Sequence, residues 1–296
     1  MTGATGFIGR YLVKTLCRLN HQMNLNLTLI LVHRSGTAPS FADKSIQWIE
    51  GSFTEDFLPE WAAPDIIIHA ASPSNQMSIF TDPTGTVNCN ILATNYLLEC
   101  AHKYNSCFLF FSSGAVYQAQ SKPLAECAAK ILAQNNALSV YGNSKLSGEL
   151  LCGQHPVDCR ILRLFSVYGP GESLTSGRCF TNFINQALKT HQIQVNSSGT
   201  QVRSYCYVSD FVSSLLYVLL KGESTVYNAG NEDNTYTILE LAKQIAAVHG
   251  DTEVLGPLST AGLTDYFVPN TQKLRHLGWQ PKVDMRTCIR RCLDSY

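Results

Sequence analysis

Two periods of apolar residues take turns along the first half of the chain. Short runs in which nearly every residue is apolar are typical of strands buried on both faces of a parallel sheet. Longer stretches with apolar residues three and four apart are typical of helices that cover such a sheet. The strand-like runs are residues 27–32, 46–49, 65–69, 107–111 and 159–165, and the helix-like stretches are 11–19, 87–104 and 138–151. This alternation predicts an α/β fold, a doubly wound parallel sheet with right-handed crossovers.

Loop signals become denser after the Gly-Pro-Gly turn at residues 169–171. Helical periods return over residues 180–189, 209–220, 238–249 and 286–293, with a strand-like run at 205–208. The pattern predicts a smaller C-terminal lobe interleaved with the sheet. We expect a sheet domain over residues 1–166, to which part of 205–230 returns, and a lobe formed mainly by residues 167–296.

Three glycines, Gly3, Gly6 and Gly9, stand three apart just before the first helical stretch. The spacing suits a tight turn at a helix N-terminus, where backbone N–H groups face a pyrophosphate, although a simple turn would also use glycines. A dinucleotide fold places a buried strand directly before this turn, and only Met1 and Thr2 precede Gly3. We therefore expect either a start inside that first strand or a sheet that lacks it.

The balanced charge of the chain limits the classes of binding partner that the sequence suggests. Lys and Arg total 22, as do Asp and Glu, so no global field attracts nucleic acid or an anionic membrane. The 11 cysteines show no zinc-like spacing, and we expect free thiols and no metal, even for Cys288 and Cys292. No signal peptide is visible, and no apolar run reaches the roughly 20 residues of a membrane span, so the sequence predicts a cytoplasmic protein.

Candidate chemistry begins after the strand-like run 107–111, where Ser112 and Ser113 follow. Ligands bind at the carboxyl ends of strands in open α/β sheets, although an ordinary Ser-Gly turn is the alternative. Farther along, Tyr141 and Lys145 are four residues apart and share one face of the predicted helix. A nearby positive charge lowers the pKa of a phenol, which would let Tyr141 accept a proton near neutral pH. Such a pair also arises by chance, so the order of glycine turn, serines and Tyr-Lys pair carries the interpretation.

In that order the motifs resemble those of the extended short-chain dehydrogenases/reductases, the family of nucleotide-sugar epimerases, dehydratases and reductases. The similar segments are residues 2–9, 65–71, 90–94, 112–117, 141–145, 163–170, 203–210 and 277–281, which cover nearly the whole chain. The resemblance implies a Rossmann-type sheet, NAD as cofactor with NADP as the alternative, a nucleotide-diphosphate sugar as substrate, and a homodimer.

The resemblance also implies roles for single residues. Tyr141 takes the proton of a sugar hydroxyl while hydride leaves the same carbon, Ser113 hydrogen-bonds the reacting oxygen, and Lys145 holds the nicotinamide ribose. The implied cofactor contacts are Gly3, Thr5, Gly6, Phe7, Ile8, Gly9, Arg34, Ala70, Ala71, Ser72, Asn90, Ser112, Tyr141, Lys145 and Phe165. The implied substrate contacts are Ser113, Tyr117, Ser166 and Arg203, the last at the diphosphate. His69, beside the dinucleotide, is expected to be packed and hydrogen-bonded rather than catalytic.

Departures from the family pattern narrow the reaction. Gly114 and Ala115 replace the Asp-Glu pair of sugar 4,6-dehydratases, and Ala115 replaces the glutamate expected of a decarboxylase. A 4-epimerase or an NADPH-dependent 4-keto-sugar reductase remains, with a non-catalytic dinucleotide-binding protein as the third hypothesis. Arg34, with no acid beside it, favours NADP, although it could equally stack on the adenine or point to solvent. Residues 52–53 suggest an altered adenine pocket. Residues 261–265 lack the family's second diphosphate-binding arginine.

Overall fold

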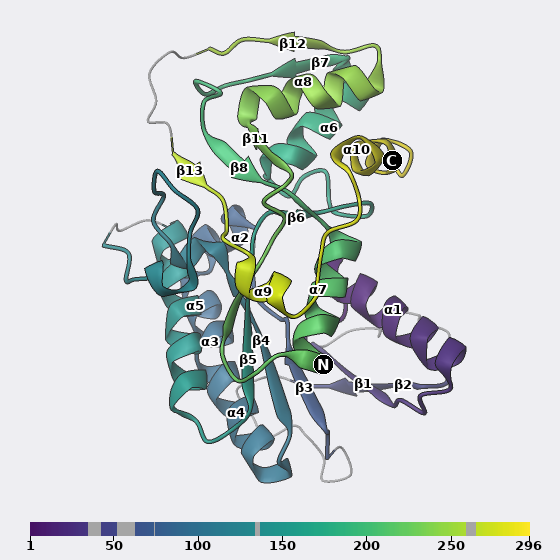
Figure 1. Ribbon diagram of the computed structural model, residues 1–296, viewed down its shortest axis with the longest axis vertical. Coiled ribbons are helices and arrows are strands. Elements are labelled where there is room, and N and C mark those ends of the chain that lie inside the picture. The colour runs from purple at the N-terminus through teal and green to yellow at the C-terminus, as the bar shows by residue number, and fades with distance from the viewer. Residues whose placement is uncertain (35–42, 52–62, 74, 134–136, 259–264) are drawn as a thin grey trace.

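A parallel sheet lies at the base of the molecule (Figure 1). The computed structural model describes residues 1–34, 43–51, 63–73, 75–133, 137–258 and 265–296, so residues 52–53 and 261–264 lie outside the described residues. The strands of this sheet are β1 (Leu29–His33), β2 (Ile46–Glu50), β3 (Ile66–His69), β4 (Cys107–Ser113), β5 (Cys159–Leu164) and β10 (Val226–Ala229). They form two parallel groups, β2-β1 and β3-β4-β5-β10.

Met1 and Thr2 join the two groups. Thr2 bridges Val32 of β1 on one side and His69 of β3 on the other, both in the parallel sense. The Met1 amine donates to the Ile30 carbonyl (2.6 Å), and burial lowers the pKa of this amine to about 5. Two residues therefore stand where the predicted central strand belongs. His69 is fully buried with its Nδ1 2.8 Å from Thr2 Oγ1, which confirms it as a packed, hydrogen-bonded residue.

Helices cover both faces of the sheet, as Figure 1 shows for α1 and α7 on one side and α4 and α5 on the other. Their bounds, with those of two shorter helices, are α1 (Phe7–Met23), α2 (Gln76–Thr81), α3 (Pro83–Asn90), α4 (Leu92–Tyr104), α5 (Ala137–Gln154) and α7 (Val208–Lys221). The predicted helix over 87–104 is two helices that meet at Ile91. The first begins earlier than predicted, because the Asp82 side chain caps its N-terminus and Pro83 occupies its first position.

The upper lobe in Figure 1 is built from short strands and helices. Its elements are β6 (Val167–Tyr168), α6 (Cys179–Thr190), β7 (Gln192–Gln194), β8 (Val202–Ser204), β9 (Cys206–Tyr207), β11 (Thr235–Thr237), α8 (Ile238–His249), β12 (Glu253–Leu255), β13 (Tyr266–Phe267) and α10 (Met285–Leu293). The short helix α9 (Gln272–His276) packs instead against β10 and α7. The turns η2 (Gly114–Val116) and η3 (Glu126–Ala128) are 3-10 helices. Strands of two to four residues show no readable period, which is why most of them escaped prediction.

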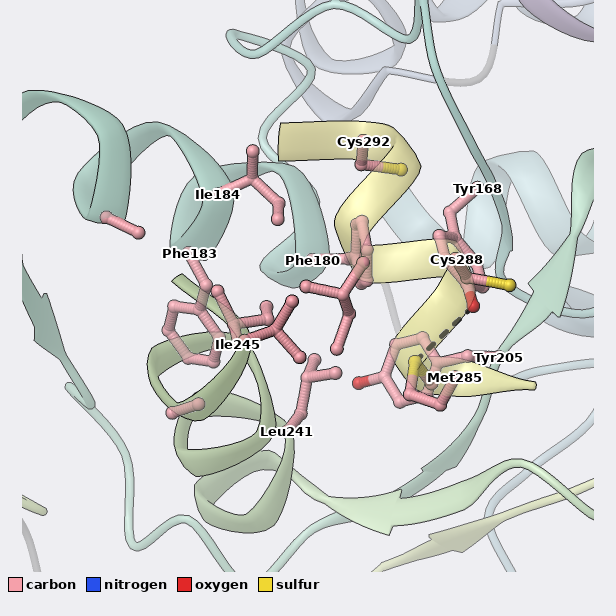
Figure 2. Close-up of a cluster of buried hydrophobic side chains, with 14 of the residues drawn as sticks. Tyr168, Phe180, Phe183, Ile184, Tyr205, Leu241, Ile245, Met285, Cys288 and Cys292 are labelled. Carbon is pink, nitrogen blue, oxygen red and sulfur yellow. Dashed lines mark hydrogen bonds between the residues drawn. The ribbon is translucent and has the colours of Figure 1, made fainter. Parts of the chain in front are cut away.

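A separate hydrophobic core holds this lobe together (Figure 2). Side chains of α6, α8 and α10 converge there, and Tyr168 and Phe180 stack with ring centroids 4.1 Å apart. The Tyr168 hydroxyl donates to the sulfur of Met285 (3.4 Å). Cys288 and Cys292 are buried in this core as free thiols. None of the helices in the described part of the chain has the length and apolar character to cross a membrane.

Candidate active site

The glycine turn packs tightly against the loop after β3. Gly3 has a φ of +72°, and a Cβ there would lie 2.6 Å from the backbone of Ala70 and Ala71. A Cβ on Gly9 would lie 2.0 Å from the Gly3 carbonyl oxygen, which also accepts the Gly6 N–H (3.1 Å). Only glycine therefore fits at positions 3 and 9, and the turn leads directly into α1.

The outer side of this turn is accessible. Thr5 and Gly6 are exposed, and Phe7 and Ile8 are partly exposed. In the described chain no side chain caps the start of α1, and its first turn carries no acidic residue. Its N–H groups therefore offer an anion site of the kind that holds a pyrophosphate. The residues present thus fit a dinucleotide. Arg34 follows β1 and is exposed, on the same side of the sheet as the turn.

A chain of polar groups joins the loop after β3 to helices α3 and α5. Ser72 donates to Asn90 Oδ1 (2.8 Å), and Asn90 Nδ2 donates to Ser144 Oγ (2.9 Å). Asn90 is fully buried, so both ends of its amide are used inside the protein rather than presented to a cofactor. Its role here is to position Ser72. Ala70, Ala71 and Ser72 themselves are partly exposed beside the glycine turn.

Tyr141 of α5 and Ser113 at the end of β4 come together, although 28 positions separate them. The hydroxyl groups of Ser113 and Ser72 lie near the Tyr141 phenol and favour its ionised form. Burial raises the pKa of Tyr141, and the two hydroxyls and the positive charge of Arg178 oppose that rise. The prediction of a lowered pKa is therefore wrong for this structure, because loss of water around the phenol outweighs these partners.

Lys145 lies one turn beyond Tyr141 and points into the protein. Its side chain is 1% exposed, and Nζ donates to the carbonyl oxygen of Phe111 on β4 (2.7 Å). Nζ also lies 4.9 Å from the ring centroid of Phe110. Burial lowers the pKa of Lys145 to about 8, and the negative charge of Glu149 acts against that shift. The ammonium thus fastens α5 to the end of β4, directly behind Ser113.

One turn farther along α5, Glu149 forms a buried ion pair with Arg163 of β5. Arg163 Nε donates to Oε1 (2.8 Å) and Nη2 to Oε2 (2.5 Å), and both side chains are 5% exposed. Ser112 Oγ also donates to Glu149 Oε1. On its other side, Arg163 Nη1 donates to Tyr117 Oη (2.6 Å), which donates to Asn228 Oδ1 (2.7 Å). The pair thus links the end of β4 to β10.

This network changes the roles predicted for three residues. Ser112 is buried and its hydroxyl donates a hydrogen bond to Glu149, so that hydroxyl does not face a cofactor. Tyr117 is buried too, and its hydroxyl is held inside by Arg163 rather than turned to a substrate. Phe165, 1% exposed, packs between the rings of Tyr117 and Phe267 (centroids 5.7 and 5.5 Å away). Its ring is therefore a core side chain rather than a cofactor contact.

The residues predicted for the substrate side lie between the sheet and the upper lobe. Ser166 follows β5 with a φ of +37° and is exposed. Arg203 on β8 is partly exposed and pairs with Asp265 through two bonds, Nη1–Oδ1 (2.7 Å) and Nη2–Oδ2 (2.8 Å). Arg203, the residue expected to bind a diphosphate, is thus partly accessible, but its guanidinium is already paired with the carboxylate of Asp265.

Sequence reasoning overlooked Glu149 and Asp265. A signal existed for Glu149, since it stands four residues after Lys145 on the same helical face, and an arginine inside the apolar run 159–165 calls for a partner. No local signal marked Asp265, because its partner Arg203 lies 62 positions earlier.

Comparisons with known proteins show which family of proteins the chain is similar to. The model of the NAD dependent epimerase/dehydratase family matches residues 1–230. The chain is 30% identical over 301 residues to UDP-glucuronic acid decarboxylase 6 of Arabidopsis thaliana, an alignment that covers 97% of this chain and 84% of that protein.

Solved structures show the same fold. A UDP-glucuronic acid 4-epimerase variant of Bacillus cereus, in complex with NAD and a fluorinated UDP-glucuronic acid, aligns with a TM-score of 0.83 and 24% identity. That alignment covers 99% of this chain and 97% of the other. UDP-glucose 4-epimerase of Thermotoga maritima aligns with a TM-score of 0.80 and 23% identity over 99% of this chain and 96% of that one. The sheet and lobe described above are thus the Rossmann-type architecture of these proteins.

Proposed function

The chain belongs to the NAD-dependent epimerase/dehydratase family, and from that premise we propose that it is a nucleotide-sugar 4-epimerase. The reaction would oxidise one sugar carbon transiently and return the hydride to the opposite face. The observation that carries the proposal is the proximity of the Ser113 hydroxyl to the Tyr141 phenol, with glycine and alanine in the next two positions after the serine.

The dinucleotide would lie on the glycine turn, with its pyrophosphate at the N-terminus of α1. Its nicotinamide would supply the reversible hydride transfer to and from the sugar carbon. The positive charge of an oxidised nicotinamide near the phenol would lower the pKa of Tyr141 that burial raises. Oη could then take the proton of the sugar hydroxyl and later return it, while Ser113 Oγ would hydrogen-bond the same oxygen. Lys145 keeps the end of β4 and the catalytic helix in register, through its bond to the Phe111 carbonyl.

The surroundings of Gly114 support epimerisation over elimination or decarboxylation. A Cβ on Gly114 would lie 3.1 Å from the rings of both Phe165 and Phe267, so any larger side chain there would have to displace these two rings. Position 115 carries only a methyl group. Among the described residues, the strongest influences on the pKa of Tyr141 are hydroxyls, a guanidinium and a thiol, without a carboxylate. The two positions that follow the serine therefore carry no acid or base for removing water or a carboxyl group.

The substrate class follows from the relatives. The relative from Arabidopsis is named for UDP-glucuronic acid, and the aligned structures were solved with UDP-glucose or a UDP-glucuronic acid analogue. We propose a UDP-sugar as the first substrate to test.

The test begins with the purified protein. Denaturing it and identifying the released dinucleotide by mass spectrometry should yield NAD. Incubation with UDP-glucuronic acid or UDP-glucose, without added cofactor, should produce the 4-epimer. Proton NMR detects the epimer from the changed couplings of the sugar H4 to H3 and H5. Release of carbon dioxide with a UDP-pentose would replace the proposal by a decarboxylase, in spite of Ala115.

A specific observation favours a second candidate, an NADPH-dependent 4-keto-sugar reductase. Arg34 directly follows β1 and is exposed, where an acid would bind the adenine ribose of NAD and an arginine accommodates the phosphate of NADP. A reductase would consume NADPH in proportion to a 4-keto nucleotide sugar, and the denatured protein would release no NAD.

A further inference from the structure

The segment 265–270, which we call the strap, lies between the upper lobe and the loop that follows the catalytic serine. On the lobe side, Val202 N donates to the Asp265 carbonyl (2.8 Å), and β13 runs parallel to β8. On the other side, Leu124 N donates to the Val268 carbonyl (2.8 Å) and Asn270 N donates to the Leu124 carbonyl (2.9 Å). The strap is therefore bonded to both halves of the molecule.

Phe267 in the middle of the strap contacts the turn η2, which follows Ser113. Its ring lies 5.5 Å from the ring of Phe165 and would touch a Cβ on Gly114, the residue after Ser113. The guanidinium of Arg203 lies over the other part of this ring, with Cζ 5.6 Å from the centroid. The ring of Phe267 therefore connects Arg203 to Gly114, the residue next to the catalytic serine.

Asp265 closes the strap on Arg203. The two bonds of 2.7 and 2.8 Å use the paired N–H groups with which an arginine also binds one phosphate group. Arg203 Nη1 donates in addition to the Val202 carbonyl (2.9 Å). The side chains of Arg203 and Asp265 are 27% and 32% exposed, so an anion from solution can reach the pair.

We propose that Asp265 competes with the substrate diphosphate for Arg203 and thereby sets the affinity for nucleotide sugars. The inference rests on the proposed function, because it takes the ligand to be a nucleoside diphosphate. The guanidinium presents one such fork, so a phosphate group gains its two charge-assisted bonds only after Asp265 gives them up. Substrate binding then releases the Asp265 end of the strap, two residues before Phe267, whose ring packs near the turn η2 after Ser113.

The experiment measures binding by isothermal titration calorimetry with UDP, dTDP, GDP and CDP, each beside its nucleoside. Asp265→Asn keeps the shape of the side chain and removes its charge. We expect this variant to bind the preferred diphosphate about 2- to 5-fold more tightly, the size expected for a partly exposed ion pair. Binding of the matching nucleoside should not change. Asp265→Ser tests the same point if the asparagine variant does not fold.

Asp158→Asn is the matched control. Asp158 also forms a close pair with an arginine, Arg160 (2.6 Å), at the opposite end of β5 from Phe165. This variant removes the same charge and should leave diphosphate binding unchanged.

Arg203→Gln completes a double-mutant cycle. It should weaken diphosphate binding, and Asp265→Asn should add little in its presence. Unchanged or weaker binding by Asp265→Asn overturns the competition, as does an equal gain in the Arg203→Gln background, which would reveal a long-range charge effect. If neither the unsubstituted protein nor Asp265→Asn binds any of the four diphosphates, the proposed function itself fails.

Discussion

The buried pair of Glu149 and Arg163 offers the sharpest test of how the site is held together. Arg163→Met removes the guanidinium and keeps a similar apolar stem. Glu149, 5% exposed, then loses both bonds to the guanidinium, and among the described residues the Ser112 hydroxyl and the positive charge of Lys145 remain near it. Breaking a buried ion pair in this way costs about 3–5 kcal/mol of unfolding free energy. That is a large share of the roughly 5–15 kcal/mol by which a folded protein is stable.

The double variant Glu149→Met/Arg163→Met separates the pair from its isolated charge. With both charges gone, apolar packing replaces the pair, a change that is often neutral or stabilising. The Ser112 hydroxyl loses its partner, at a cost of about 1–3 kcal/mol, whereas the Tyr117 hydroxyl keeps its bond to Asn228. We therefore expect the double variant to be more stable than Arg163→Met but less stable than the unsubstituted protein.

Urea unfolding followed by circular dichroism measures these differences, provided that the slope of free energy against urea stays constant. A loss below about 1 kcal/mol in Arg163→Met would refute the reasoning, since a buried charge cannot lose its partner so cheaply. A double variant less stable than the single one would also refute it. Activity should fall in both variants, because Ser112 is the residue next to Ser113.

Four further changes test the site. Tyr141→Phe should abolish turnover and retain the cofactor, since only the proton-transferring hydroxyl is lost; normal turnover would remove Tyr141 from the mechanism. Gly9→Ala places a Cβ 2.0 Å from the Gly3 carbonyl oxygen, so we expect a loss of about 3 kcal/mol or more and weak dinucleotide binding, measured by thermal unfolding and calorimetry. Burial raises the pKa of Glu172 from 4.5 to about 7. The native state therefore holds a proton that the unfolded chain loses between these values, and stability falls as pH rises from about 4.5 to 7. Glu172→Gln should remove this slope and gain about 1–3 kcal/mol at pH 8, and a slope that persists in urea unfolding would contradict the assignment. Arg34→Ala should weaken binding of NADP more than that of NAD in parallel titrations, and equal losses would show that Arg34 does not contact the phosphate.

Much of the fold followed from local pattern. Runs such as 107–111 and 159–165 became β4 and β5, because a strand buried on both faces needs apolar side chains throughout. The long helix predicted over 87–104 was divided, since the cap at Asp82 and the break at Ile91 leave no mark in the apolar period. The short strands of the upper lobe were missed for the same reason.

For the site, the sequence by itself determined the glycine turn, the serines at the end of a strand and the Tyr-Lys pair on a helix, because each is a local arrangement set by backbone geometry and residue spacing. Only the tertiary structure decided which of these groups remains available to a ligand and which is hydrogen-bonded or ion-paired within the protein. Ser112 turns to Glu149 while its neighbour Ser113 meets Tyr141, and Arg203 is held by Asp265. Hydrogen bonds and ion pairs are satisfied by whichever partner the fold brings within about 3 Å, and those partners lie tens of residues away in the chain.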